Sequence, residues 1–178
     1  MRQRIAAAIG ISTLLLFGSS CGGSASPPTT TGPIVTARPA PCPSKAPTTE
    51  PSPARSGLDV DLVPPGPVYG TVCRYQGFNG TAKPGSLVRS HLLSGAALTS
   101  VVALFDSPRW QVITQPAVYN CPMDDGASDM VEFAYPTGPA ARVRVALSGC
   151  RFASNGVRTV AGYAIGQLLA AWVGTPTT

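Results

Sequence analysis

The residues of this chain that could do chemistry do not combine into a known catalytic arrangement. His91 is the only histidine, and a nucleophile needs such a base beside it, together with a group that orients the base. Alternation along the chain places His91 on the face of Leu87 and Leu93, which is typical of a half-buried strand histidine. Residues 58–178 contain no Gly-x-Ser-x-Gly elbow, Ser-x-x-Lys motif or Gly-rich phosphate loop. We therefore assign no catalytic residue and predict that the protein is not an enzyme.

The acidic and cysteine residues do not predict a metal or cofactor site. The densest acidic pair is Asp124 and Asp125, in the segment from Cys121 to Gly126. An oxygen-rich calcium loop needs more ligands than these at regular spacing, whereas Asp side chains commonly hydrogen-bond the backbone of turns. The cysteines lack the close spacing of zinc ligands. We expect no metal and no cofactor.

The charge of the chain gives no sign of a nucleic-acid partner. The formal net charge is +5, but five of the basic residues precede Leu58. From Leu58 onward there are eight basic against seven acidic residues, without a basic run or interleaved aromatic residues. The electrostatic footprint of a nucleic-acid-binding protein is therefore missing.

The first residues are typical of an export signal. Arginines at positions 2 and 4 precede thirteen mostly apolar residues, Ile5 to Phe17, and then small residues. These are the three parts of a signal peptide. The apolar run is shorter than the roughly 20 residues that span a bilayer.

The cysteine that follows this signal points to a lipid anchor. The segment Leu16-Phe17-Gly18-Ser19-Ser20-Cys21 resembles the lipobox of bacterial lipoproteins, with Gly18 where that family usually has Leu. The resemblance implies that residues 1–20 are removed and that Cys21 becomes the lipidated first residue. The protein would then be anchored in the cell membrane on its extracytoplasmic side. The alternative is cleavage after Ala25, which would give a secreted protein.

Composition divides the rest of the chain. The segment from Ser24 to Gly57 has nine prolines and six threonines in 34 residues, and it cannot bury enough apolar surface to offset its ordering entropy. We therefore expect residues 21–57 to be a disordered tether and residues 58–178 to be one folded domain. This organisation of lipobox, Pro/Thr-rich tether and compact disulfide-bonded domain resembles small, uncharacterised lipoproteins of actinobacterial type.

The folded part shows alternating strand and helix signals. Strands are predicted at Val68–Tyr75 and Leu87–Leu93, and a helix at Gly95–Asp106. A hairpin follows, in which Val131–Tyr135 and Val143–Leu147 alternate with period two on either side of a Pro/Gly turn. The helix carries an apolar stripe with the spacing i, i+3, i+4, i+7, formed by Leu98, Val101, Val102 and Phe105.

The chain repeats a strand–turn–strand–helix pattern. Cys73-Arg74-Tyr75 corresponds to Cys150-Arg151-Phe152, and Val88-Arg89 corresponds to Val157-Arg158. The second copy ends in an apolar stripe of the same spacing, formed by Ile165, Leu168, Leu169 and Trp172. Either the domain is an internal duplication, or two unrelated hairpin–helix units share turn residues and a stripe.

Striped helices and alternating strands must bury their apolar faces against each other. We therefore predict an α+β fold, with an antiparallel sheet of about five strands and two helices on one face. The side chains that we expect in the core are Leu98, Val102, Phe105, Phe133, Val145, Leu168, Leu169 and Trp172.

Four cysteines remain after Cys21, and export favours their pairing. In a hairpin that turns near Gly138, position 150 lies opposite roughly position 126, which brings Cys121 within reach of Cys150. We therefore predict the disulfides Cys121–Cys150 and Cys42–Cys73. The repeat favours the alternative Cys73–Cys150, because those two positions would be equivalent.

These observations favour binding over catalysis. We predict a non-enzymatic binding or interaction module of the cell envelope, whose partner is an unidentified envelope protein or ligand. The candidate recognition surface is Arg109, Trp110 and Tyr119, in the long loop between the two halves. One alternative is a small-ligand carrier or inhibitor with a pocket near the 107–128 loop. Another is an envelope hydrolase that uses an acidic residue and His91.

Overall fold

The structure is a computed structural model that describes residues 39–52, 54–114 and 119–174. The predicted signal peptide, Cys21 and the first part of the predicted tether lie outside the described residues. None of the helices in this described part is long and apolar enough to cross a membrane. The elements are, in chain order, β1 (Tyr69–Tyr75), β2 (Leu87–Leu93), α1 (Gly95–Phe105), β3 (Gln111–Ile113), β4 (Ser128–Ala134), β5 (Ala141–Ala146), β6 (Phe152–Ser154), β7 (Thr159–Ala161) and α2 (Ile165–Val173).

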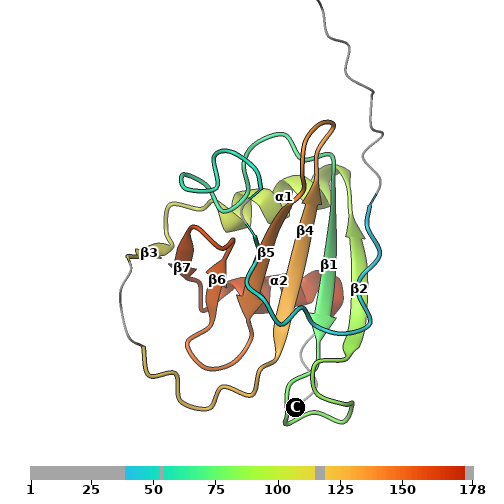
Figure 1. Ribbon diagram of the computed structural model, residues 1–178, viewed down its shortest axis with the longest axis vertical. Coiled ribbons are helices and arrows are strands. Elements are labelled where there is room, and N and C mark those ends of the chain that lie inside the picture. The colour runs from blue at the N-terminus through green and yellow to red at the C-terminus, as the bar shows by residue number, and fades with distance from the viewer. Residues whose placement is uncertain (1–38, 53, 115–118, 175–178) are drawn as a thin grey trace, which may run out of the picture. The chain divides into compact units, whose positions relative to one another are not determined.

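The strands of the described chain form one seven-stranded antiparallel sheet in the order β2-β1-β4-β5-β6-β7-β3. Both helices lie behind this sheet in Figure 1. The predicted fold class, α+β with two helices and an antiparallel sheet, is confirmed, but the sheet has seven strands rather than about five. The strands β3, β6 and β7 have three residues each, which is too short for alternation to mark them in the sequence.

The two strand–turn–strand–helix units occupy equivalent places in the sheet. The hairpin of β4 and β5 lies between them, with β1 and β2 on one side and β6, β7 and then β3 on the other. Each outer hairpin continues directly into a helix, β2 into α1 and β7 into α2. The hairpin loops differ in length, with residues 76–86 in the first unit and 155–158 in the second.

The main core lies between the helices and the sheet. Phe105 of α1 packs edge-on against Phe133 of β4, with 5.8 Å between the ring centroids. On α2 the buried stripe runs along one face at i, i+4 and i+8, formed by Ile165, Leu169 and Val173. Leu168 lies beside this stripe and is 43% exposed, so the prediction that it is buried is wrong. Val102 and Trp172 are half-buried at the edge of the core.

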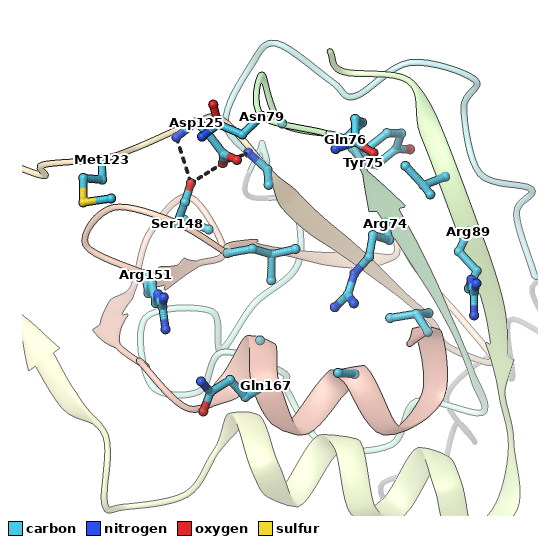
Figure 2. Close-up of a pocket in the computed structure, with 18 of the residues that line it drawn as sticks. Arg74, Tyr75, Gln76, Asn79, Arg89, Met123, Asp125, Ser148, Arg151 and Gln167 are labelled. Carbon is cyan, nitrogen blue, oxygen red and sulfur yellow. Dashed lines mark hydrogen bonds between the residues drawn. The ribbon is translucent and has the colours of Figure 1, made fainter. Parts of the chain in front are cut away.

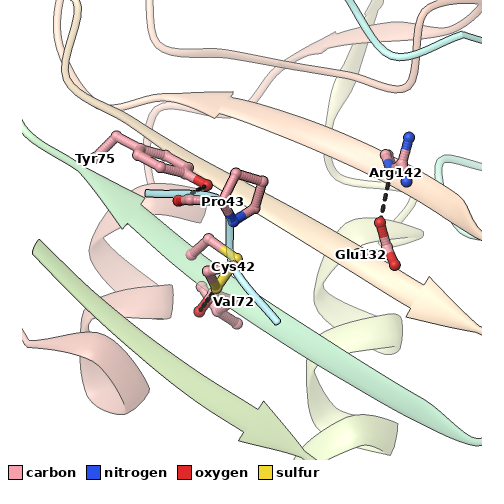
Figure 3. Close-up of a disulfide and its surroundings, with 7 residues drawn as sticks. Cys42, Pro43, Val72, Tyr75, Glu132 and Arg142 are labelled. Carbon is pink, nitrogen blue, oxygen red and sulfur yellow. Dashed lines mark hydrogen bonds and ion pairs between the residues drawn. A yellow bond between two sulfur atoms is a disulfide. The ribbon is translucent and has the colours of Figure 1, made fainter. Parts of the chain in front are cut away.

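The segment 39–50, which we call the strap, lies across part of the opposite face of the sheet; Figure 1 shows it crossing in front of the strands. A disulfide joins its Cys42 to Cys73 of β1, with 5.6 Å between the Cα atoms. The hydroxyl group of Tyr75 donates a hydrogen bond of 3.2 Å to the carbonyl oxygen of Pro43 (Figure 3). Composition alone assigns these residues to the tether, whereas the structure places the strap on the sheet.

Cross-strand pairs fix the register on the strap side of the sheet. Glu132 of β4 lies opposite Arg142 of β5, and the Arg142 Nε donates a hydrogen bond of 2.6 Å to the Glu132 carboxylate (Figure 3). Surface pairs of this kind stabilise a fold by at most about 1 kcal/mol. This pair therefore adds little to stability.

Candidate functional site

A cavity of about 670 Å³ lies between α2 and one end of the sheet. Its wall on the sheet side comes from the ends of β1 and β5, the start of β2, and the loop that precedes β4. Figure 2 shows α2 along the other side. We call it the α2 cavity; its lining residues from α2 are Gly166, Gln167, Ala170 and Val173.

Much of the α2 cavity wall is apolar. Its apolar residues come from several elements and include Val88, Ala127, Ala146, Leu147, Ala170 and Val173. Gly166 lets α2 approach the end of β5, because a Cβ atom at this position would lie 2.5 Å from Cδ2 of Leu147. A cavity of this size and composition falls in the range of small-molecule sites.

A buried ion pair anchors the C-terminal end of α2 to the sheet. Arg74 of β1 and Asp129 of β4 are direct cross-strand partners, joined by two hydrogen bonds of 2.8 and 2.7 Å. The remaining guanidinium nitrogen of Arg74 donates to the carbonyl oxygen of Gly174. Burial raises the pKa of Asp129, and the hydrogen bonds and charge of Arg74 act against that rise. The charge of Arg74 is therefore already matched by a carboxylate.

Two further arginines line the α2 cavity, and neither forms an ion pair with a described residue. Arg89 lies directly opposite Arg74 in the pairing of β1 and β2. Arg151 stacks on Tyr163, with 4.2 Å between its guanidinium carbon and the ring centroid. Figure 2 shows Arg151 and Gln167 on one side of the cavity and Arg89 on the other.

The acidic residue of the cavity lining, Asp125, is engaged in a turn. Its carboxylate accepts hydrogen bonds from the Ser148 hydroxyl group at 2.6 Å and from the Ala127 N–H at 3.0 Å. Burial acts to raise the pKa of Asp125, but these hydrogen bonds outweigh it and the pKa is lowered. Asp124 accepts from the Gly126 N–H and the same hydroxyl group. No three His, Cys, Asp or Glu side chains of the described chain gather as metal ligands would.

Exposed apolar side chains line or adjoin the α2 cavity. Met123 is 92% exposed and Tyr163 65% exposed, and both belong to its lining. Phe78, which is 74% exposed, stands between two lining residues, Gly77 and Asn79. Exposed apolar residues that cluster beside a cavity indicate contact with another apolar surface or ligand.

The second disulfide lies close in sequence to two residues of the lining, Met123 and Arg151. It joins Cys121 to Cys150, with 4.9 Å between the Cα atoms, which is the pairing that the hairpin geometry predicts. Position 150 follows the end of β5, and Cys121 lies in the loop that leads to β4. The bridge therefore fastens together the two segments that carry Met123 and Arg151.

The predicted recognition residues make separate contacts in the described chain. The indole N–H of Trp110 donates a hydrogen bond of 2.6 Å to the carbonyl oxygen of Leu104, and the ring packs against the core. Arg109 stacks over this ring at 4.2 Å. Tyr119 lies beyond a gap in the described residues and packs edge-on against Phe152 at 4.9 Å. None of the three predicted residues lines the α2 cavity.

The histidine also lies away from the α2 cavity. His91 is exposed on β2, at the edge of the sheet. It shares a shallow groove with Leu87, Leu92 and the first residues of the strap, and this groove has no acidic residue in its lining.

Sequence reasoning did not select the arginines of the cavity, although the sequence contains a signal for them. Arg74 and Arg151 follow Cys73 and Cys150 at equivalent positions of the repeat, and the fold brings both arginines to one cavity. The repeated arginine beside an aromatic residue therefore marks two residues of this cavity, which Trp110 and Tyr119 of the long loop do not line. No known protein family, curated protein or solved structure matches this chain.

Proposed function

We propose that this protein is a non-enzymatic binding module of the cell envelope that carries a small, largely apolar ligand in the α2 cavity. The observation that supports this proposal most strongly is the cavity itself, with about 670 Å³ of space between α2 and the sheet. Its volume and its mostly apolar lining with a few polar groups fall in the range of small-molecule sites.

The chemistry of the lining supports a ligand with a long apolar part. Leu147, Ala170 and Val173 offer apolar contact along the wall, and burying apolar surface contributes about 25 cal/mol per Å². The exposed side chains of Met123 and Tyr163 extend the apolar contact to the mouth. A carrier needs such contacts and no reacting groups.

The cell-envelope location rests on two features. Two disulfides in the described chain indicate an oxidising, extracytoplasmic environment. The lipobox-like segment ending at Cys21 supports attachment to the membrane by a lipid. The residues between Cys21 and the strap would then set how far the domain reaches from the membrane surface.

A pair of neighbouring residues on α2 provides the test of the carrier function. Ala170 lines the α2 cavity, whereas Ala171 is exposed to solvent. We expect the neutral fluorescent probe N-phenyl-1-naphthylamine to bind the wild-type protein, and Ala170→Trp to weaken this binding at least ten-fold by filling the cavity. Ala171→Trp should leave the affinity within two-fold of wild type.

Unfolding measured in parallel separates filling of the cavity from loss of the fold. Both variants should keep their thermal transitions, because neither replaces a core side chain. Equal probe affinity in the two variants, or no binding to the wild-type protein, would contradict the carrier function.

A further inference from the structure

We infer that the ligand of the α2 cavity is an amphipathic anion, whose charged group binds at Arg151 while its apolar chain lies along α2 and Leu147. This inference rests on the proposed function, because it specifies the chemistry of the ligand that the same cavity holds.

The balance of charge in the lining indicates an anion. The lining contains Arg74, Arg89 and Arg151 but one acidic residue, Asp125. The positive charge of Arg74 is matched by Asp129 outside the lining, and the Asp125 carboxylate is hydrogen-bonded within its own turn. Two positive charges therefore remain at the cavity without a described counter-ion.

The surroundings of these charges favour carboxylate or phosphate oxygens. A guanidinium group presents a planar fork of donors that matches both anions, and it is weakly hydrated. Apolar walls lower the local dielectric constant, which strengthens attraction to an anion. A ligand with an anionic group and an apolar chain satisfies both parts of the lining at once.

Arg151 is better placed than Arg89 to bind the anionic group. Its guanidinium is held by stacking on Tyr163, and its side chain is half-buried. Arg89 is exposed and lies beside Gly174, where a Cβ atom would be 2.8 Å from its Nη1. Gly174 follows the last residue of α2, and the partial negative charge of a helix C-terminus already favours a cation there.

The test compares two ligands of equal chain length that differ in charge. Laurate below its micelle-forming concentration and dodecan-1-ol below its solubility limit, both at pH 8, compete with N-phenyl-1-naphthylamine for the purified protein. We expect the wild-type protein to bind laurate at least ten-fold more tightly than the alcohol. Arg151→Gln should reduce this preference to less than three-fold, while Arg151→Lys retains a clear preference.

Arg109→Gln is the matched control, because it removes the same charge from a residue outside the lining of the α2 cavity. We expect it to change the preference for laurate by less than three-fold, whereas Arg89→Gln, which removes the other guanidinium of the lining, should reduce the preference less than Arg151→Gln does. Dodecyl phosphate should compete like laurate, and inorganic phosphate alone should not displace the probe. Displacement by inorganic phosphate would show that a free anion, rather than the headgroup of an amphiphile, occupies the site and would overturn the inference.

Equal affinity of the wild-type protein for laurate and dodecan-1-ol would also overturn it, as would a preference that depends on Arg89 and not on Arg151. In both cases, binding of the neutral probe and its loss in Ala170→Trp would still support a carrier. Failure of the neutral probe to bind would instead remove the proposed function itself.

Discussion

Met123 and Arg151 adopt left-handed backbone conformations on the two segments that one disulfide joins. Their φ angles are 60° and 52°, and they are the non-glycine residues of the described chain with positive φ. Met123 follows Cys121 by two residues, and Arg151 directly follows Cys150. Such conformations cost about 1–3 kcal/mol each and persist where the surrounding structure enforces them. Backbone strain is thus concentrated at the mouth of the α2 cavity.

Glycine at position 123 should relieve part of this strain. The Met123 side chain is 92% exposed, so Met123→Gly removes little packing and should leave the free energy of unfolding unchanged or raise it by up to about 1 kcal/mol. Met123→Val should lower it by about 1 kcal/mol, because a β-branched residue tolerates positive φ poorly. Urea denaturation measures both. A stabilising effect of valine would contradict the conformation assigned to this residue.

The parts of the fold that the sequence predicted well are those with long local patterns. The hairpin around Gly138, the strand containing Cys73 and the helix ending at Phe105 all carry periodicity over six or more residues. Periodicity predicted less well which side chains of a helix are buried, since Leu168 fits the spacing of the apolar stripe and yet is exposed. When a helix of only nine residues rotates about its axis by one residue, its apolar side chains still form a stripe of similar spacing.

The candidate site could not be predicted in the same way. The α2 cavity combines residues as distant in the chain as Arg74 and Gln167, and an empty space leaves no periodic signal in a sequence. Its size depends on how closely α2 approaches Leu147, which Gly166 allows. The aromatic residues of the loop that contains Trp110 gave a stronger local signal for a binding site. The Trp110 indole instead stabilises the fold, because its N–H donates a hydrogen bond to the carbonyl oxygen of Leu104.

Two neighbouring leucines of α2 test the orientation of this helix. Leu169 is fully buried, whereas Leu168 is 43% exposed. Leu169→Ala should therefore lower the free energy of unfolding by about 2–5 kcal/mol, and Leu168→Ala by less than about 1 kcal/mol. Chemical denaturation of the two variants compares them directly. Equal losses would mean that α2 presents a different face to the sheet.

Asp106 should make stability depend on pH. Burial raises its pKa to about 6, against the hydrogen bond that its carboxylate accepts from the Val63 N–H at 3.1 Å. Because the pKa is higher in the folded than in the unfolded state, the folded protein binds more protons between pH 3.8 and about 6. The contribution of Asp106 to stability is therefore fully present below this window and is lost as the pH rises through it.

The variant Asp106→Asn isolates this effect, because its amide oxygen can still accept from Val63. Relative to wild type, the variant should gain stability between pH 4.5 and pH 7.5, by about 1 kcal/mol after allowance for solvent screening at a half-buried site. Urea midpoints at the two pH values give the difference. A difference that is the same at both would show that the carboxyl does not titrate in this window.

Cys21→Ser should release the protein from the membrane fraction. Cys21 lies outside the described residues, and lipid on this residue is the anchor that the lipobox-like segment implies. Buried acyl chains contribute about 0.8 kcal/mol per CH₂ group, and more than one chain is needed for stable anchoring. Fractionation followed by a salt wash measures the release. Retention of the variant, or a wild-type protein that begins at Ser26, would rule out the lipid anchor.

The two disulfides should differ in their effect on ligand binding but not in their effect on stability. Cys42–Cys73 and Cys121–Cys150 span 31 and 29 residues, so the chain-entropy estimate is roughly 3.5 kcal/mol for each. The first bridge fastens the strap to the face of the sheet opposite the helices. The second joins the two strained segments at the cavity mouth.

Removing both cysteines of a bridge by Ser substitution tests this difference, once peptide mapping of the unreduced protein has identified the pairs. At a temperature where both variants are folded, loss of Cys121–Cys150 should weaken binding of N-phenyl-1-naphthylamine at least five-fold, because Met123 and Arg151 can then relax away from the cavity. Loss of Cys42–Cys73 should change the affinity by less than two-fold. A Cys73–Cys150 crosslink in the mapping would contradict the pairing, and equal losses of affinity would show that the Cys121–Cys150 bridge does not shape the site.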